Sequence, residues 1–143
     1  MRWPEGLTAR LRVGEAALLL IVARLLIMCV RFGVWRPWLG QMVNTACRPA
    51  TTPPMVTWGL VTAVERAQQR LHYPFKCLPR AMALQWMLAR RGISTTLLIG
   101  VARGEAMGQL HDLHAWVEVN GTTVIGTDPS RVYARVLALA SVG

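Results

Sequence analysis

The chain has 143 residues, of which 53% are hydrophobic and 16% charged; this suits one domain with a real core and argues against disorder. Sixteen Lys+Arg outweigh seven Asp+Glu, so the formal net charge is +9 and an acidic partner is expected. The sequence has no Lys/Arg-rich run and no nucleic-acid-binding motif, which excludes nucleic acid as the favoured partner and leaves an acidic peptide or a membrane surface.

A long apolar segment, EAALLLIVARLLIMCVRFGVW, occupies residues 15–35. Arg24 and Arg31 interrupt it well before the roughly 20 apolar residues that a membrane-spanning helix needs, and no signal-peptide cleavage site follows. Arg10, Arg24 and Arg31 are spaced so that they share one side of a helix. We expect a long helix packed on the domain with a narrow basic stripe in water. A helix lying on a membrane or on a partner protein is the alternative.

Proline and glycine divide the chain after this segment. WRPWLG ends the first helical region, and CRPATTPPM (47–55) is typical of an extended connector. MVTWGLVTAVERAQQRL (55–71) predicts a second helix, which HYPFK ends because Pro74 disfavours helix at Tyr73. We therefore expect an N-terminal helical region over 1–48, which packs on or extends the domain, and a core over 49–143, within a single domain overall.

CLPRAMALQWMLARRG begins at Cys77 and has a helical period, with Pro79 in the first turn and Gly92 at the end. Cys77 therefore lies at or just before a helix N-terminus. The helix dipole, the free backbone N–H groups and Lys76 all favour its thiolate, and those N–H groups could also hold an oxyanion. The alternative is that Cys77 is a small buried hydrophobic residue.

The three cysteines are Cys29, Cys47 and Cys77. Their odd number and the absence of a Cys-x-x-Cys pair argue against a disulfide framework or a zinc ribbon and favour a reducing cytosol. We therefore expect a cytoplasmic protein, with membrane association left open. Cys29, inside the apolar helix, is expected to be in the core.

Strand signals follow Gly92. STTLLIGVA (94–102) is rich in β-branched residues, and LHAWVEV, Asn-Gly and TTVIGT (113–127) predict a hairpin. His114, Trp116 and Glu118 alternate onto one face of the first hairpin strand. His111 is expected at the loop edge, in solvent.

A cysteine at a helix start, followed by a strand histidine, is the layout that a thiol–histidine nucleophile needs. A zinc site from His111, His114 and Cys77 is disfavoured because a fourth ligand is missing. No metal or other cofactor is therefore expected.

CLPRAMALQWMLARRGISTTLLIGVARG followed by HAWVEVNG resembles the leader peptidase of lasso-peptide biosynthesis, the maturation B protein, within the transglutaminase-like, papain-related cysteine peptidases. The resemblance runs from about Val61 to Gly126. It implies an α+β fold of transglutaminase/papain-like type, with helices packed on a small antiparallel sheet. It also implies a Cys77 nucleophile, a His114 base and an acid on the next strand. The substrate would be a ribosomal precursor peptide whose leader is removed before macrolactam closure.

The resemblance does not assign the third catalytic residue directly, because Gly126 stands where similar sequences often have aspartate. Asp128 is the nearest acid, ahead of Glu118 and Asp112. A two-residue Asn-Gly turn would turn Asp128 away from the face of His114, whereas a three-residue loop with a bulge at Gly121, or a kink at Gly126, would bring it there. We expect one of these last two arrangements, the bulged loop or the kink, with Asp128 hydrogen-bonded to His114.

The resemblance also implies partners. The chain has no room before Cys77 for the family's leader-recognition module, so a separate leader-recognition protein and an ATP-dependent lasso cyclase are expected. Two alternatives are kept. One is a transglutaminase-like acyl transferase that uses the same Cys77 and His114. The other is a non-catalytic membrane-surface or scaffold subunit of a biosynthetic complex.

Overall fold

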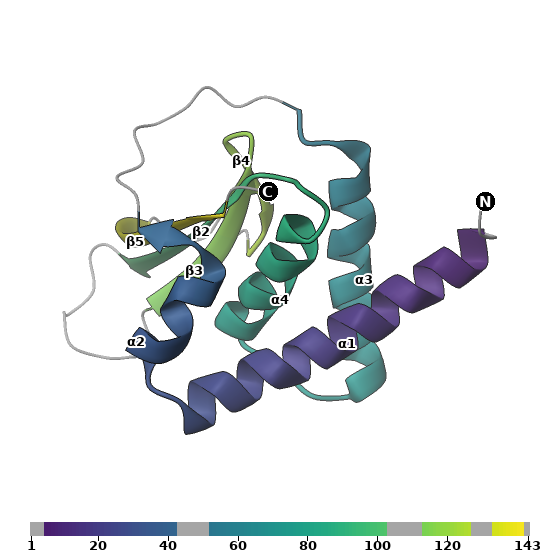
Figure 1. The fold of residues 1–143 in the computed structure, drawn as a ribbon, viewed down its shortest axis with the longest axis horizontal. Coiled ribbons are helices and arrows are strands. Elements are labelled where there is room, and N and C mark those ends of the chain that lie inside the picture. The colour runs from purple at the N-terminus through teal and green to yellow at the C-terminus, as the bar shows by residue number, and fades with distance from the viewer. Residues whose placement is uncertain (1–4, 43–51, 103–112, 127–132, 142–143) are drawn as a thin grey trace.

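The structure, a computed structural model, describes residues 5–42, 52–102, 113–126 and 133–141. Within them, helices pack on one face of a five-stranded antiparallel sheet (Figure 1), which confirms the predicted α+β class. The helices are α1 (Glu5–Cys29), α2 (Phe32–Trp35), the 3-10 helix η1 (Arg36–Leu39), α3 (Met55–Leu71) and α4 (Cys77–Ala89).

The strands run in the order β1-β5-β2-β3-β4, and each neighbouring pair is antiparallel. Their bounds are β1 (Gln41–Met42), β2 (Thr95–Ala102), β3 (Leu113–Val119), β4 (Thr122–Ile125) and β5 (Tyr133–Ser141). The sequence patterns predicted β2, β3 and β4 but assigned no strand to β5, which lies between β1 and β2. Its Leu/Ala-rich sequence, YARVLALAS, lacks the β-branched enrichment that indicates a strand.

The two predicted central helices are confirmed. α3 covers the predicted residues 55–71, and His72 ends it in the left-handed conformation, with φ of 49°. α4 begins at Cys77 and its helical hydrogen bonds end near Arg90, followed by Gly92 at φ of +73°. The connection to Thr95 is short, and the Thr95 hydroxyl at the start of β2 bonds to Gln85 of α4.

α1 begins earlier than the apolar segment suggested and lies along the outside of the helical layer, against α3 and α4 (Figure 1). It buries Val13, Ala16, Leu20 and Ala23 in the main core. No helix of the described part of the chain is long and apolar enough to cross a membrane.

Two expectations for α1 are wrong. Cys29 is exposed rather than buried, because the side of α1 that meets the core near this end carries Ala23, Leu26 and Ile27. The outer side is not simply a basic stripe in water: Arg24 is half-buried, with its guanidinium 5.9 Å from the ring centre of Tyr73. Much of the outward surface is instead apolar.

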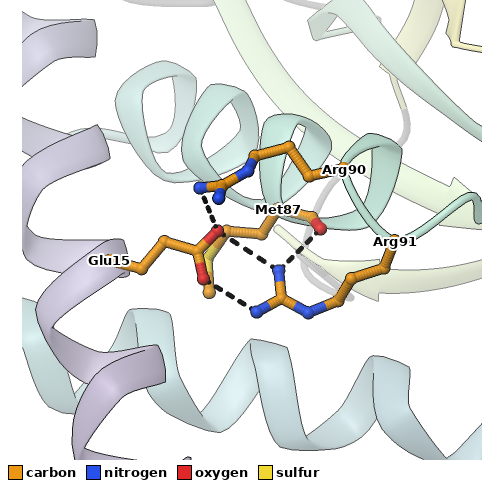
Figure 2. A network of polar contacts seen from close by, with 4 residues as sticks. All are labelled: Glu15, Met87, Arg90 and Arg91. Carbon is orange, nitrogen blue, oxygen red and sulfur yellow. Dashed lines mark hydrogen bonds and ion pairs between the residues drawn. The ribbon is translucent and has the colours of Figure 1, made fainter.

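An ionic clamp joins α1 to the end of α4 (Figure 2). Glu15 Oε1 lies 2.8 Å from an Arg90 nitrogen, and Glu15 Oε2 lies 2.8 Å from Arg91. Arg91 also donates to the Met87 carbonyl at 2.9 Å. The Glu15 side chain is only 15% exposed, so this pairing is shielded more than an ordinary surface ion pair.

A buried amide joins α4 to the sheet. The Gln85 side chain donates to the carbonyls of Leu39, at 2.8 Å, and Leu139, at 2.9 Å. It accepts from the Thr95 hydroxyl at 2.8 Å. Both amide hydrogens and the amide oxygen are therefore satisfied, as a fully buried polar group requires.

The β3–β4 hairpin differs from the prediction. Val119 pairs with Thr122, so the turn has two residues, and the expected three-residue loop with a bulge at Gly121 is wrong. Asn120 and Gly121 have φ of 52° and 78°, the conformation of a type I′ turn, which Asn-Gly adopts at little cost.

A β-bulge nevertheless occurs farther from the turn. Glu118 pairs with Thr123 but Val117 pairs with Ile125, so Val124 is the extra residue. Val124 and Ile125 both reach the helix-side core, which explains why the strand accepts the irregularity. The inward–outward alternation is reversed beyond this point.

Candidate active site

Cys77 is the first residue of α4, and its thiol is free and half-buried. Lys76 precedes the helix in an extended conformation, with no side-chain cap. The first backbone N–H groups of a helix have no intrahelical acceptor, and Pro79 has no N–H, so those of Cys77 and Leu78 are the donors available beside the thiol. The predicted position of Cys77 at a helix start is therefore confirmed.

His114 is the second residue of β3, paired with Gly100 of β2. Its ring stacks on Tyr133, with centroids 4.7 Å apart and planes 24° apart, and more loosely on Trp116 at 6.0 Å. Trp116 belongs to a small cluster with Leu98 and Ala138, with Tyr133 packed against it. The histidine ring therefore lies on an aromatic surface that limits its rotation.

The Nε2 atom of His114 makes a hydrogen bond with the Gly126 carbonyl oxygen. A carbonyl can only accept, so Nε2 carries the hydrogen in this contact. In the neutral ring this leaves the lone pair on Nδ1. The contact therefore selects the tautomer in which Nδ1 is the base.

Position 126 requires glycine in this structure. Gly126 has φ of +83°, and a Cβ added there would lie 2.6 Å from the Ala115 oxygen and 2.9 Å from the Trp116 Cβ. A side chain, including an aspartate, does not fit without a shift of the backbone. In the sequence Gly126 is a departure from the pattern of similar proteins, but its role as a carbonyl acceptor depends on the bulge, which the sequence does not indicate.

Cys77 and His114 are on different sides of the sheet. Cys77 packs against the helix-side core, which includes Ala115 and Val117, whereas His114 stacks within the aromatic group on the opposite face. No hydrogen bond joins these two residues, both of which the structure describes. Their direct cooperation therefore stays a prediction.

Of the three acidic residues considered as partners of His114, the structure describes Glu118. Its carboxylate accepts a hydrogen bond from the Trp116 indole at 3.2 Å. The other two, Asp128 and Asp112, lie outside the described residues, and so do His111 and Cys47. Within the described residues, no group of three His, Cys, Asp or Glu side chains could hold a metal ion.

The chain matches the Transglutaminase-like superfamily over residues 25–138, a range that includes Cys77, His114 and all five strands of the sheet except the last residues of β5. It therefore belongs to the transglutaminase-like superfamily. Comparisons with curated proteins and with solved structures find no match.

Proposed function

We propose that this chain is a cysteine peptidase that removes the leader from a ribosomally made lasso-peptide precursor before the macrolactam closes. Membership of the transglutaminase-like superfamily supports a cysteine-based acyl chemistry. The observation that carries the residue assignment is the His114–Gly126 contact, which holds an imidazole with a basic Nδ1 at the start of β3. The narrower substrate assignment rests on the resemblance of the Cys77 and His114 segments to lasso leader peptidases.

In the proposed reaction, His114 Nδ1 takes the proton of the Cys77 thiol, and the thiolate sulfur attacks the carbonyl carbon of the leader–core bond. Backbone N–H groups at the start of α4 stabilise the oxyanion. The imidazolium then protonates the leaving amine, giving a thioester, and water hydrolyses this thioester to free the leader carboxylate and the thiol. For this chemistry the Cys77 sulfur and the His114 ring must come within hydrogen-bond distance.

We propose Asp128 as the acidic member of the site. In a plain two-residue hairpin, Asp128 would face away from His114. The bulge at Val124 reverses the alternation of side chains beyond it, and this reversal is what the assignment of Asp128 to the face of His114 needs. The Gly126 carbonyl already holds the His114 tautomer. The role left for Asp128 is to stabilise the positive charge that develops on the imidazole.

The substrate assignment brings two partners. A separate leader-recognition protein would present the precursor, and an ATP-dependent cyclase would use the freed core. The net charge of +9 favours an acidic leader only through long-range attraction, so specific affinity would come from the recognition protein.

One observation favours a second candidate, a non-catalytic scaffold subunit. Cys77 packs with the helix-side core while His114 stacks on the other face of the sheet. On this alternative Cys77 serves only packing, and its replacement by alanine leaves function intact.

Mass spectrometry of a precursor incubated with the chain and its recognition protein tests the proposal. We expect cleavage at the leader–core bond, and Cys77→Ala to lower its rate by at least about 10³-fold, since the covalent nucleophile is lost. Cys29→Ser and Cys47→Ser are the matched thiol controls and should keep most of the activity.

The product distinguishes the remaining alternatives. A free leader carboxylate indicates hydrolysis, whereas a leader joined to an added amine indicates an acyl transferase. Undiminished cleavage by Cys77→Ala would remove both enzymatic assignments.

A further inference from the structure

α1 has two apolar faces, and the described fold covers only one. Val13, Ala16, Leu20 and Ala23 face the core. On the other side Leu11, Leu18, Leu25 and Met28 are between 54% and 64% exposed. A helix that is apolar on both sides is normally covered on both sides, so the outer face is a candidate contact surface.

The exposed residues follow a heptad pattern. Along the outer face the positions are spaced alternately by four and three residues, and every position in the series is exposed. We call this set the outer seam. It consists of Leu7, Leu11, Gly14, Leu18, Ile21, Leu25 and Met28. This spacing is that of the a and d positions by which one helix packs along another. On one flank the seam is bordered by Ala17 and Arg24, which are half-buried against the domain; on the other flank Val22 and Cys29 are also exposed.

The charges beside the seam are predominantly positive. Arg10 and Arg24 directly precede Leu11 and Leu25, at the positions that flank a coiled-coil contact. Glu15 is on the opposite flank, but both of its carboxylate oxygens are bonded to Arg90 and Arg91. Arg24 is half-buried with its guanidinium over the Tyr73 ring, so Arg10 is the exposed cation among these flanking residues, and no free acid among them pairs with it.

This charge pattern selects among possible occupants. A second copy of α1 would bring Arg10 against a surface that offers it no free acid, because Glu15 of that copy is already paired. A lipid surface needs only a broad apolar face that sinks into the acyl boundary, whereas the residues of the outer seam keep the regular a/d spacing of a helix–helix contact. A helix with apolar a and d residues and acidic flanks fits both the spacing and the charge.

We propose that the outer seam of α1 binds an acidic amphipathic helix of a different polypeptide. The seam residues pack against the partner's apolar positions, and Arg10, which is exposed beside Leu11, pairs with a flanking carboxylate. This interaction does not depend on the peptidase assignment, because none of its residues belongs to the candidate active site.

The test uses a pair of synthetic peptides of about 28 residues, long enough to form a stable helical stripe. Both have Leu and Ile at the a and d positions; one has Glu at e and g, and the other has Lys. Fluorescence anisotropy with the full chain should show saturable binding of the Glu peptide that weakens with salt, and binding of the Lys peptide at least about tenfold weaker.

The combined variant Leu11→Gln, Leu18→Gln, Leu25→Gln should weaken binding of the Glu peptide by at least about tenfold while circular dichroism stays unchanged. Met55→Gln is the matched control, because Met55 is 90% exposed on α3, away from the seam. Arg10→Glu, a single exposed change, should shift the preference toward the Lys peptide.

Three results would overturn the proposal. One is equal affinity for the two peptides, or for the wild type and the combined variant. Another is co-sedimentation with phosphatidylcholine/phosphatidylglycerol vesicles that the combined variant loses, without peptide binding; this would assign the seam to a lipid surface. The third is a dimer in analytical ultracentrifugation that the same variant loses without peptide binding, which would assign the seam to a second copy.

Discussion

The Gly126 carbonyl accepts the Nε2–H of His114, and the same residue must be glycine because a Cβ would meet the Ala115 oxygen. A backbone acceptor at this place holds the imidazole tautomer without a charged side chain. The stacking of His114 on Tyr133 adds a second constraint on the ring. From these contacts we expect different losses of activity when His114 and the acidic residue proposed beside it, Asp128, are replaced.

Replacing His114 by alanine removes the proposed general base. We expect the rate of leader cleavage to fall by at least about 10³-fold, close to the loss in Cys77→Ala, because members of a catalytic unit act non-additively. Steady-state cleavage, followed by mass spectrometry, measures this loss.

His111→Ala and His72→Ala are the controls. His72 is exposed at the end of α3, and each replacement should change the rate only mildly. A larger loss in His111→Ala than in His114→Ala would transfer the base to His111.

Asp128→Asn keeps the size of the side chain but removes its charge. We expect a loss of roughly 10- to 100-fold in kcat, below the roughly 10⁴-fold that follows when a catalytic histidine also loses its tautomer. The smaller loss is expected because the Gly126 carbonyl still accepts from Nε2. Wild-type turnover of Asp128→Asn, with Glu118→Gln impaired instead, would move the acidic role to Glu118.

At the scale of the elements, Gln85 holds α4 in place. Its amide connects the helix to the Leu39 carbonyl, to the Leu139 carbonyl of β5 and to the Thr95 hydroxyl of β2. Cys77 begins the same helix, eight residues before Gln85.

Gln85→Met preserves the length of the side chain but leaves three buried polar groups without their partner. We expect the free energy of unfolding to fall by about 2–4 kcal/mol, measured by urea denaturation. Gln69→Met, at an exposed position of α3, is the matched control and should change it by less than about 0.5 kcal/mol. Equal stability of the two variants would show that the Gln85 contacts contribute little.

At the scale of the whole molecule, α1 is attached by a narrow buried face and by the Glu15 clamp. Glu15→Ala removes the bonds to Arg90 and Arg91 and leaves Arg91, which is 28% exposed, without its carboxylate. We expect a loss of about 1–3 kcal/mol and a Tm lower by several degrees, measured by thermal denaturation.

Glu65→Ala is the corresponding control, because Glu65 is exposed on α3. If Glu15→Ala retains the wild-type Tm, the clamp does not stabilise the attachment of α1, and the buried residues of the helix account for it alone.

Local signals in the sequence determined several elements. The helix over 55–71, the helix start at Cys77 and the strand over 113–119 follow from side-chain period and proline position, which act within a few residues. Asn120-Gly121 likewise indicated a turn, since this pair accepts positive φ. The order of Cys77 and His114 along the chain, the proposed nucleophile and base, was equally visible.

The tertiary structure decided the features that depend on distant partners. β5 lies inside the sheet although its Leu/Ala-rich sequence gave no strand signal, because β1 and β2 supply its hydrogen bonds. Cys29 is exposed because only one side of α1 meets the core. The bulge at Val124, and with it the Gly126 carbonyl at His114, depends on two adjacent side chains that both find room in the helix-side core, and no local pattern encodes that space.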